Sequence, residues 1–329
     1  MNAPLPKAAV VIPSYKVSAH ILGVLSRIGP EIQRIFVVDD NCPEQTGAMV
    51  VRDCRDPRVK VIFHERNLGV GGASLTGFQA ALEEGIEIAV KVDGDGQMDP
   101  ALIPVLLEPL QNGNADFSKG NRFFSPRNLS GMPITRLLGN AGISFIAKLT
   151  NGYWNVMDTT NGFLAIHTSL LPYLDAEKIE KRYFFENDLL FRLGLLRAVV
   201  QEVPMVAVYG DETSNLSVSR SLFSFPLKFF VRFLKRIFYR YFLRDFNAAS
   251  LLLVLGTLAM AWGAVFGAIK WYVAESAGVT ATSGTVMLAG LPIILGFQMV
   301  LYAVLYDISS VPTQPIHRAL LRQLRARKQ

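Results

Sequence analysis

The stretch Val92-Asp93-Gly94-Asp95-Gly96-Gln97-Met98-Asp99-Pro100 decides how this chain is interpreted. It follows an apolar run over residues 86–92, and this run predicts a buried strand of a parallel sheet that ends at a glycine. Open α/β sheets bind their ligands beyond the carboxyl ends of the strands. A polar turn at this place therefore predicts a ligand site, and its glycines leave room for a bulky ligand.

The two aspartates of this turn predict a metal ion. Asp93 and Asp95 are separated by one residue, so both carboxylates can point to one place, where they repel each other unless a cation lies between them. Hard oxygen ligands suit Mg²⁺ or Mn²⁺, which often complete their shell with phosphate oxygens, and Gln97 offers a further oxygen. The competing interpretation is an acidic turn that only caps the helix expected from about Pro100.

Alternating strand and helix patterns cover residues 1–220. Strands are expected at residues 8–12, 35–38, 59–63, 86–92, 116–120, 163–167 and 199–208. Helices are expected at about 18–28, 46–52, 73–84, 135–150 and 186–197, and a polar loop at 210–215. This alternation predicts an α/β domain with a doubly wound, mostly parallel sheet and right-handed crossovers.

Composition and motifs exclude several classes of protein. The glycine loop 67–72 lacks the third glycine of a dinucleotide fingerprint, since Ser74 stands there, and no phosphate-loop Gly-Lys-Ser/Thr pattern occurs. Two cysteines make neither a disulfide framework nor a zinc site. The net charge of +6 is concentrated in two patches near the C-terminus, so the body of the chain has no basic face for nucleic acid.

Two uncharged stretches predict a transmembrane hairpin over residues 247–307. Residues 248–269 and 285–306 are each long and apolar enough to cross a bilayer. A buried pair of core helices is the alternative, but such length without a charge is rare in soluble folds. Basic residues precede the first span and follow the second, so the α/β domain and both termini are expected in the cytoplasm. The N-terminus has no features of a signal peptide, which agrees with this expectation.

Residues 221–246 join the α/β domain to the first span and are expected to form an amphipathic helix. Residues 220–244 contain seven basic residues and no acid, mixed with aromatic and aliphatic residues at roughly helical spacing. This composition predicts an interfacial helix on an anionic leaflet. Residues 308–329 form a basic tail that is also expected in the cytoplasm.

Acidic loops, a divalent ion and a membrane anchor together suggest a nucleotide-sugar as substrate. A metal held by Asp93 and Asp95 would neutralise the charge that develops on a departing diphosphate. The ends of the first two strands, Pro13–Tyr15 and Asp39–Asp40, would hold the base and the ribose. Arg122 and Arg136 would suit a lipid phosphate acceptor, because arginine binds phosphate in a bidentate manner. For both arginines, a surface ion pair is the plain alternative.

Five motifs in order resemble the family 2 glycosyltransferases of the GT-A fold. They are Val11-Ile12-Pro13-Ser14-Tyr15, Val37-Val38-Asp39-Asp40, Asn67-Leu68-Gly69-Val70-Gly71-Gly72, Asp93-Gly94-Asp95-Gly96-Gln97 and Asp158-Thr159-Thr160-Asn161-Gly162-Phe163. Within the family, the chain is most similar to the polyprenyl-phosphate glycosyltransferases, the branch of dolichol-phosphate mannose synthase. The resemblance covers about residues 8–220 and implies a Rossmann-like GT-A domain.

The resemblance also implies an inverting transfer from a nucleotide-sugar to a membrane polyprenyl phosphate of the undecaprenyl type, for cell-envelope glycans at a bacterial inner membrane. It implies that Asp93, Asp95 and Gln97 ligate Mg²⁺ or Mn²⁺. The nucleotide-sugar contacts that it implies are Pro13, Tyr15, Asp39, Asp40 and Asn67, and the acceptor-phosphate contacts are Arg122, Arg136 and Asn140. A phosphate acceptor needs no strong base, whereas a sugar hydroxyl would need a general base, for which Asp158, Glu186 or Asp188 are candidates. The catalytic candidates are Asp93, Asp95 and Asp158.

The chain departs from the family pattern at the first motif, where Lys16 and Val17 replace the usual Asn-Glu and leave the donor open. Two other functions remain open as well. One is a glycosyltransferase that extends a lipid-linked saccharide, and the other is a catalytically silent, membrane-tethered scaffold that binds a nucleotide-sugar. Self-association through the spans is a further hypothesis about partners.

Overall fold

The computed structural model describes residues 5–125, 134–205 and 218–327, without the side chains of 134–138, 218–224 and 327. The polar loop expected at residues 210–215 and the side chain of Arg136 therefore lie outside the described part. The chain divides into two compact units, Met1–Phe233 with Pro312–Gln329 and Leu234–Val311. The sequence instead predicts four segments, which stay predictions: the α/β domain, the amphipathic helix, the transmembrane hairpin and the basic tail.

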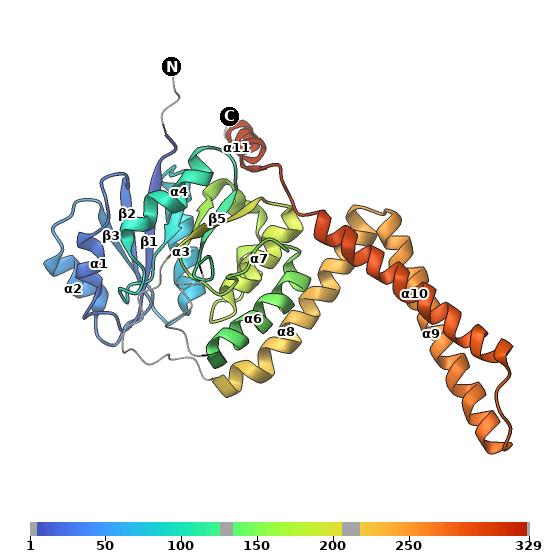
Figure 1. Cartoon of the computed structure of the whole chain (residues 1–329). Helices are drawn as coiled ribbons and strands as arrows, with labels where there is room; N and C mark the ends of the chain where they lie inside the picture. The colour runs from blue at the N-terminus through green and yellow to red at the C-terminus, as the bar shows by residue number, and fades with distance from the viewer. Residues whose placement is uncertain (1–4, 126–133, 206–217, 328–329) are drawn as a thin grey trace. The chain divides into compact units, whose positions relative to one another are not determined.

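The first unit is built on a seven-stranded sheet (Figure 1). Its strands are β1 (Ala8–Ser14), β2 (Arg34–Asp39), β3 (Val59–Phe63), β4 (Ile88–Lys91), β5 (Phe117–Asn121), β6 (Leu164–His167) and β7 (Val200–Pro204). The order is β3-β2-β1-β4-β6-β5-β7. Only β6 runs antiparallel to its neighbours β4 and β5, so the prediction of a mostly parallel sheet is confirmed.

The strand directions bring the polar segments to one edge of the sheet. The carboxyl ends of β1, β2, β4 and β5 lie there, and so does the amino end of β6, because β6 runs in the opposite direction. The strand order reverses between β1 and β4, which is the topological switch point where such sheets bind ligands.

Helices cover both faces of the sheet. They are α1 (Ile21–Ser26), α2 (Thr46–Asp53), α3 (Val70–Glu83), α4 (Ile103–Gln111, after the 3₁₀ turn η1, Pro100–Leu102), α6 (Ile134–Asn151), α7 (Phe185–Leu196) and α8 (Val218–Phe238). Two further 3₁₀ turns, η2 (Thr168–Tyr173) and η3 (Ala176–Lys178), lie between β6 and α7. The expected helices are present, although α1 is shorter than expected. Helix α1 begins after His20, whose side chain makes no capping bond, and the Ser18 hydroxyl donates to Glu44 Oε2 at 2.6 Å.

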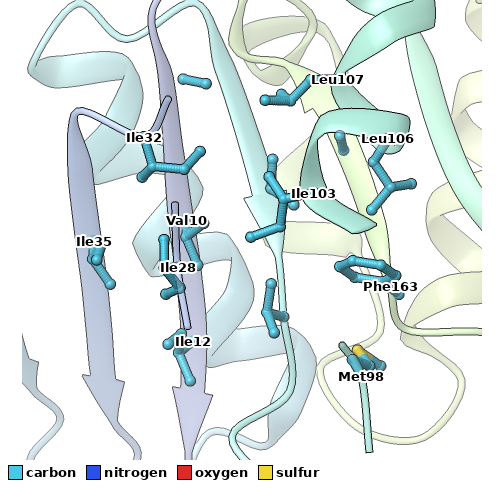
Figure 2. Close-up of a cluster of buried hydrophobic side chains, with 14 of the residues drawn as sticks. Val10, Ile12, Ile28, Ile32, Ile35, Met98, Ile103, Leu106, Leu107 and Phe163 are labelled. Carbon is cyan, nitrogen blue, oxygen red and sulfur yellow. The ribbon is translucent and has the colours of Figure 1, made fainter. Parts of the chain in front are cut away.

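Apolar side chains between the sheet and one helical layer form the main core. Alternate residues of the central strands, such as Val10 and Ile12, pack against α1 and against Ile103, Leu106 and Leu107 around α4 (Figure 2). Helix α3 approaches the opposite face so closely that a Cβ on Gly77 would lie 2.2 Å from the side chain of Val11. The period-two alternation of β1 thus fills both layers.

The second unit contains the two predicted spans. Helices α9 (Ala248–Ser276) and α10 (Ser283–Ser309) are long and apolar enough to cross a membrane, and only 11% of the most apolar window of each is buried. Such exposure does not fit core helices of a soluble protein. The two helices pack through small residues, since a Cβ on Gly256 would lie 2.7 Å from the carbonyl oxygen of Gly296.

Several basic residues of α8 and the following π-helical turn η4 (Tyr239–Arg244) pair with acids of the protein. In the first unit, Lys228 pairs with Glu180 at 2.8 Å and Arg232 with Asp188 at 2.7 Å. In the second, Arg236 binds Asp307 through two hydrogen bonds of 2.9 and 2.8 Å. These three residues therefore each have an acid partner within the protein, and the expected interfacial helix stays a prediction. The exposed side chains of α8 include Leu227, Phe230, Val231, Leu234 and Phe238.

The basic tail is not a free extension. Residues His317–Arg327 form helix α11, which belongs to the same compact unit as the sheet. The buried carboxylate of Asp116 accepts hydrogen bonds from the backbone N–H groups of Ile316 and His317 and from His317 Nδ1. The ring of His317 stacks on His167, with 3.9 Å between centroids. The residue directly before β5 thus caps a helix 200 residues later.

Candidate active site

The loop after β4 presents the predicted metal ligands at the ligand-binding edge of the sheet. Asp93, Asp95 and Gln97 are half-buried, and Asp95 Oδ1 accepts a hydrogen bond from the backbone N–H of Gln97 at 3.0 Å. Gly96 adopts φ +81°, a left-handed conformation that permits this tight turn. The loop leads into η1, whose N-cap Asp99 accepts from Ala101 N–H. The acidic turn therefore does cap a helix, but through Asp99 and not through Asp93 or Asp95.

Lys91, the last residue of β4, lies beneath this loop and was not singled out from the sequence. Its side chain is 1% exposed, and its Nζ lies 2.5 Å from Asp93 Oδ1, 3.3 Å from the carbonyl oxygen of Gly162 and 3.6 Å from Glu186 Oε1. Burial opposes its charge, but the nearby Asp93 and Glu186 carboxylates outweigh burial and hold the pKa of Lys91 above its usual value. A lysine that ends an apolar strand immediately before an acidic turn was the available signal.

The residues of the loop fit a divalent ion that is also bound by its substrate. Two carboxylates and an amide are hard oxygen donors of the kind that Mg²⁺ and Mn²⁺ prefer. The described residues contain no group of three or more His, Cys, Asp or Glu side chains that could hold a metal ion. The protein would therefore supply part of the coordination shell, and water or phosphate oxygens would complete it.

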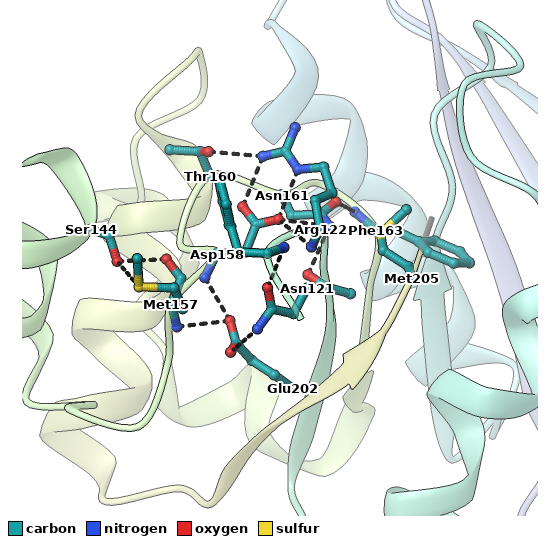
Figure 3. A network of polar contacts seen from close by, with 12 residues as sticks. Asn121, Arg122, Ser144, Met157, Asp158, Thr160, Asn161, Phe163, Glu202 and Met205 are labelled. Carbon is teal, nitrogen blue, oxygen red and sulfur yellow. Dashed lines mark hydrogen bonds and ion pairs between the residues drawn. The ribbon is translucent and has the colours of Figure 1, made fainter. Parts of the chain in front are cut away.

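Arg122 and Asp158 form a bidentate ion pair on the other side of the edge (Figure 3). Arg122 Nε and Nη2 donate to the two oxygens of Asp158 at 2.7 and 2.8 Å, and the backbone N–H of Arg122 donates at 3.0 Å. The Asp158 side chain is fully buried, whereas that of Arg122 is 17% exposed. The buried Asp158 carboxylate thus holds the guanidinium of Arg122 at the edge of the site.

Glu202 of β7 fastens the segment that carries Asp158. Its Oε1 accepts from the backbone N–H groups of Met157 and Asp158, and its Oε2 accepts from Asn121 Nδ2 (Figure 3). Asn161 donates to the carbonyl oxygen of Gly120 at 2.7 Å and accepts from Phe163 N–H at 3.0 Å. Sequence reasoning missed Glu202, because nothing in its strand pattern distinguishes it from a solvent-facing residue.

Asp39 and Asp40, expected at the nucleotide, are both buried and make internal bonds. Asp39 accepts from the N–H groups of Cys42 and Gly47 at 2.7 and 2.6 Å. Asp40 accepts from His64 Nδ1, Leu68 N–H and Gly69 N–H at 2.7–2.8 Å. Asn67, also expected at the nucleotide, donates to the carbonyl oxygen of Asp40 at 3.1 Å. Their shared structural role is to hold the loops after β2 and β3 together.

The end of β1 offers more accessible groups. Pro13 is buried within β1, but Tyr15 directly after the strand is 43% exposed. Lys16 adopts φ +57°, its backbone N–H donates to Cys42 Sγ, and its Nζ lies 5.7 Å from the centre of the Tyr15 ring. Non-glycine residues in this conformation concentrate at functional sites. The expected contact of Tyr15 with the nucleotide stays a prediction.

The remaining candidates lie on α6 and α7. Asn140 is half-buried on α6, which also carries Arg136. Asp188 is fully buried and pairs with Arg232, and Glu186 lies at Lys91. Burial raises the pKa of Glu186 above its usual value, while the Lys91 charge opposes this rise. Burial also lowers the pKa of Lys119 on β5 to about 8, and no side chain among the described residues accepts a hydrogen bond from its Nζ.

The sheet order, the switch point and the acidic loop after β4 define a transferase of the GT-A fold. Solved structures support the fold: glucosyl-3-phosphoglycerate synthase from Mycobacterium tuberculosis, in complex with Mn²⁺, UDP-glucose and glycerol 3-phosphate, has a TM-score of 0.51 at 20% identity, over 70% of this chain and 80% of that chain. The chain belongs to glycosyl transferase family 2, whose model matches residues 9–174.

Curated relatives come from the same family. The chain is 31% identical to UDP-N-acetylglucosamine--dolichyl-phosphate N-acetylglucosaminyltransferase of Methanococcus voltae, over 61% of this chain and 86% of that protein. It is also 31% identical to undecaprenyl-phosphate mannosyltransferase of Micrococcus luteus, over 61% of this chain and 84% of that protein. The resemblance stated from the five motifs is thereby confirmed.

Proposed function

We propose that the protein is an inverting, divalent-metal-dependent glycosyltransferase that moves a sugar from a nucleotide-sugar to a polyprenyl phosphate of the undecaprenyl type. The observation that carries the proposal is the arrangement at one sheet edge: the Asp93–Gln97 loop lies on one side and the Arg122–Asp158 pair on the other. The relatives support both substrates, because one is named for a UDP-sugar and a dolichyl phosphate and the other for undecaprenyl phosphate.

The carboxylates of the site favour an acceptor that is already ionised. A sugar hydroxyl would need a general base, and Asp158, Glu186 and Asp188 were the candidates. Asp158 is bound by Arg122, Asp188 by Arg232, and Glu186 lies 3.6 Å from the Lys91 ammonium. A phosphate monoester needs no such base, since its oxygen is the nucleophile at neutral pH.

Each group then has a defined task. A divalent ion bound at Asp93, Asp95 and Gln97 supplies positive charge for the diphosphate leaving group. Arg122 binds the acceptor phosphate, and Asp158 fixes the orientation of its guanidinium. Tyr15 and the loops held by Asp39, Asp40 and Asn67 form the nucleotide side, and Arg136 and Asn140 the acceptor side. In this scheme, Asp158 is a positioning residue and not a base.

The location that we propose is the cytoplasmic face of a bacterial inner membrane, where the enzyme would supply lipid-linked sugar for envelope glycans. Helices α9 and α10 would span the membrane, and their basic flanks favour cytoplasmic ends. Helix α11 supports this topology, because the residues after the second span form one compact unit with the sheet. The exposed Phe145 and Ile146 of α6 offer apolar contacts to a prenyl chain.

A direct test is sugar transfer by the detergent-solubilised protein with Mn²⁺ or Mg²⁺. A panel of labelled nucleotide-sugars is offered with undecaprenyl phosphate and, in parallel, with a lipid-linked saccharide, and Asp95→Asn is assayed beside the wild type. Metal-dependent label in the lipid phase, lost in the variant, is the expected result. Label only on a lipid-linked saccharide would favour the extending enzyme, and nucleotide-sugar binding without any transfer would favour the scaffold.

A further inference from the structure

The side chain of Lys91 pairs with one of the residues that are proposed to bind the metal ion. Its ammonium lies 2.5 Å from Asp93 Oδ1, so one oxygen of the first predicted metal ligand already has a cationic partner. Lys91 is fully buried and ends a central strand, which leaves its side chain little freedom to move away. A Cβ on Gly162 would lie 2.5 Å from Nζ and 2.9 Å from Asp93 Oδ2, so the segment after Asp158 closes over this pair.

A second carboxylate offers Lys91 an alternative partner. Glu186 Oε1 lies 3.6 Å from Nζ, on the first turn of α7. The ammonium is therefore shared between Asp93, Glu186 and the carbonyl oxygen of Gly162. The more closely it associates with Asp93, the less negative charge that residue can offer to another cation.

We propose that Lys91 is a resident counter-ion of the metal loop: its ammonium competes with the divalent ion for Asp93, so the ion is held firmly only when the donor diphosphate adds its own negative charge. The inference rests on the proposed function, and it adds that metal and donor bind as a pair. Of the two carboxylates proposed to bind the ion, Asp93 and Asp95, the first is shared with Lys91, so the ion alone has a weak site. Release of the nucleotide product then weakens the hold on the ion.

Removing the Lys91 ammonium has two opposite consequences for metal binding. Its hydrogen bond helps to orient Asp93, and this gain is modest because water competes for the same groups. Its positive charge repels a divalent ion at close range in a partly buried site, and this repulsion is the larger effect. Removal of the ammonium is therefore expected to tighten metal binding, although it disturbs the geometry needed for transfer.

The experiment measures Mn²⁺ affinity by electron paramagnetic resonance on the full-length protein in detergent, with and without UDP, and with GDP in parallel. For the wild type, we expect at least tenfold tighter Mn²⁺ binding with a nucleotide diphosphate than without. Lys91→Met should bind Mn²⁺ alone at least tenfold more tightly than the wild type. Glu186→Gln should bind it at least threefold more weakly, because Lys91 then associates with Asp93 alone. Lys60→Met is the matched control, since Lys60 pairs with Glu84 at 3.0 Å on the surface and should leave the affinity unchanged.

Opposite shifts in the two variants would support the inference, because a merely structural role would weaken binding in both. Shifts in the same direction, or wild-type affinity in Lys91→Met, would overturn it. If Lys91→Met does not fold, Glu186→Gln and the double variant Lys91→Met/Glu186→Gln provide the comparison. Absence of Mn²⁺ binding to the wild type even with nucleotide would overturn the proposed metal dependence itself, whereas binding that Lys91 does not influence would overturn only this inference.

Discussion

Substitutions at Arg122 and Asp158 should destabilise the protein unequally. The Asp158 carboxylate is fully buried, while the guanidinium of Arg122 retains 17% exposure. Arg122→Met therefore leaves a buried carboxylate for which, in the described part of the chain, the Arg122 N–H and Asn161 remain as hydrogen-bond donors. Asp158→Asn leaves a guanidinium that reaches solvent and still contacts Thr160 at 3.2 Å. We expect the arginine variant to be the less stable of the two.

Removing one partner of a buried pair costs about 3–5 kcal/mol, so we assign about 4 kcal/mol to Arg122→Met. Because the charge left behind by Asp158→Asn is hydrated, about 2 kcal/mol is expected for that variant. For a unit of this size, 1 kcal/mol shifts the melting temperature by about 2–4 °C. The expected decreases are thus about 10 °C for Arg122→Met and about 5 °C for Asp158→Asn.

The assay is thermal unfolding of the detergent-solubilised full-length protein at one scan rate, with the double variant included. The double variant should lose less than the sum of the single variants by at least about 1.5 kcal/mol, because neither charge is then left alone. A larger loss for Asp158→Asn than for Arg122→Met, or additive losses, would refute the reasoning. Either result would mean that the ion pair is not buried as the structure shows.

Three further predictions concern other parts of the first unit. Asp95→Asn should reduce transfer at least about 100-fold without changing the melting temperature, as lipid-phase label and unfolding scans would show. Asp116→Asn should release α11, so trypsin should cleave faster at Arg318 and remove a C-terminal tag. Burial acts to raise the pKa of Asp116, but hydrogen bonds from His317 and the backbone hold this pKa below 3.8. The ionised Asp116 should therefore stabilise the protein fully above about pH 4 and lose this effect as the pH falls below that value. Acid unfolding of the wild type beside Asp116→Asn checks this. Lys119→Met should stabilise the protein by about 3 kcal/mol at pH 7, because burial lowers the pKa of this lysine from 10.5 to about 8. The stability of the wild type should rise from about pH 8 to pH 10.5, as Lys119 loses its proton in the folded state first. A stability that does not change over this pH range would contradict the lowered pKa of Lys119.

The fold was predictable because its signals are local. Each central strand is a run of apolar residues followed at once by polar residues, as in β1 before Tyr15 and β4 before Asp93. The spacing of these runs predicts the parallel strands, and the uncharged stretches predict α9 and α10. The antiparallel course of β6 was not predictable, because its four residues show the same apolar pattern as their parallel neighbours.

The site was predictable only where residues adjacent in sequence act together. The metal loop was found because Asp93 and Asp95 stand in one turn. Arg122 and Asp158 were assigned separate roles, since nothing in the sequence shows that residues 36 positions apart form one ion pair. Glu202 is separated from Asp158 by 44 positions, so its part in fixing that segment became visible only in the structure.

The charges of α8 show how residues distant in sequence change the reading of a basic segment. Lys228, Arg232, Arg236 and Arg240 recur every four residues and thus lie on one stripe. The first two pair with acids of the sheet-containing unit, and Arg236 pairs with Asp307 of the hairpin, while Arg240 Nη2 donates to Ser310 Oγ at 2.6 Å. A basic stripe followed by a membrane span suggested attraction to anionic lipid, but acids distant in sequence already balance it. The exposed side chains in the described part of α8 are mostly apolar, with Lys235 as an exposed charge, so contact with a bilayer should depend on burial of Leu227 and Phe230 more than on salt. Four basic residues of this segment thus have partners within the protein, a structural role that a count of charges does not show.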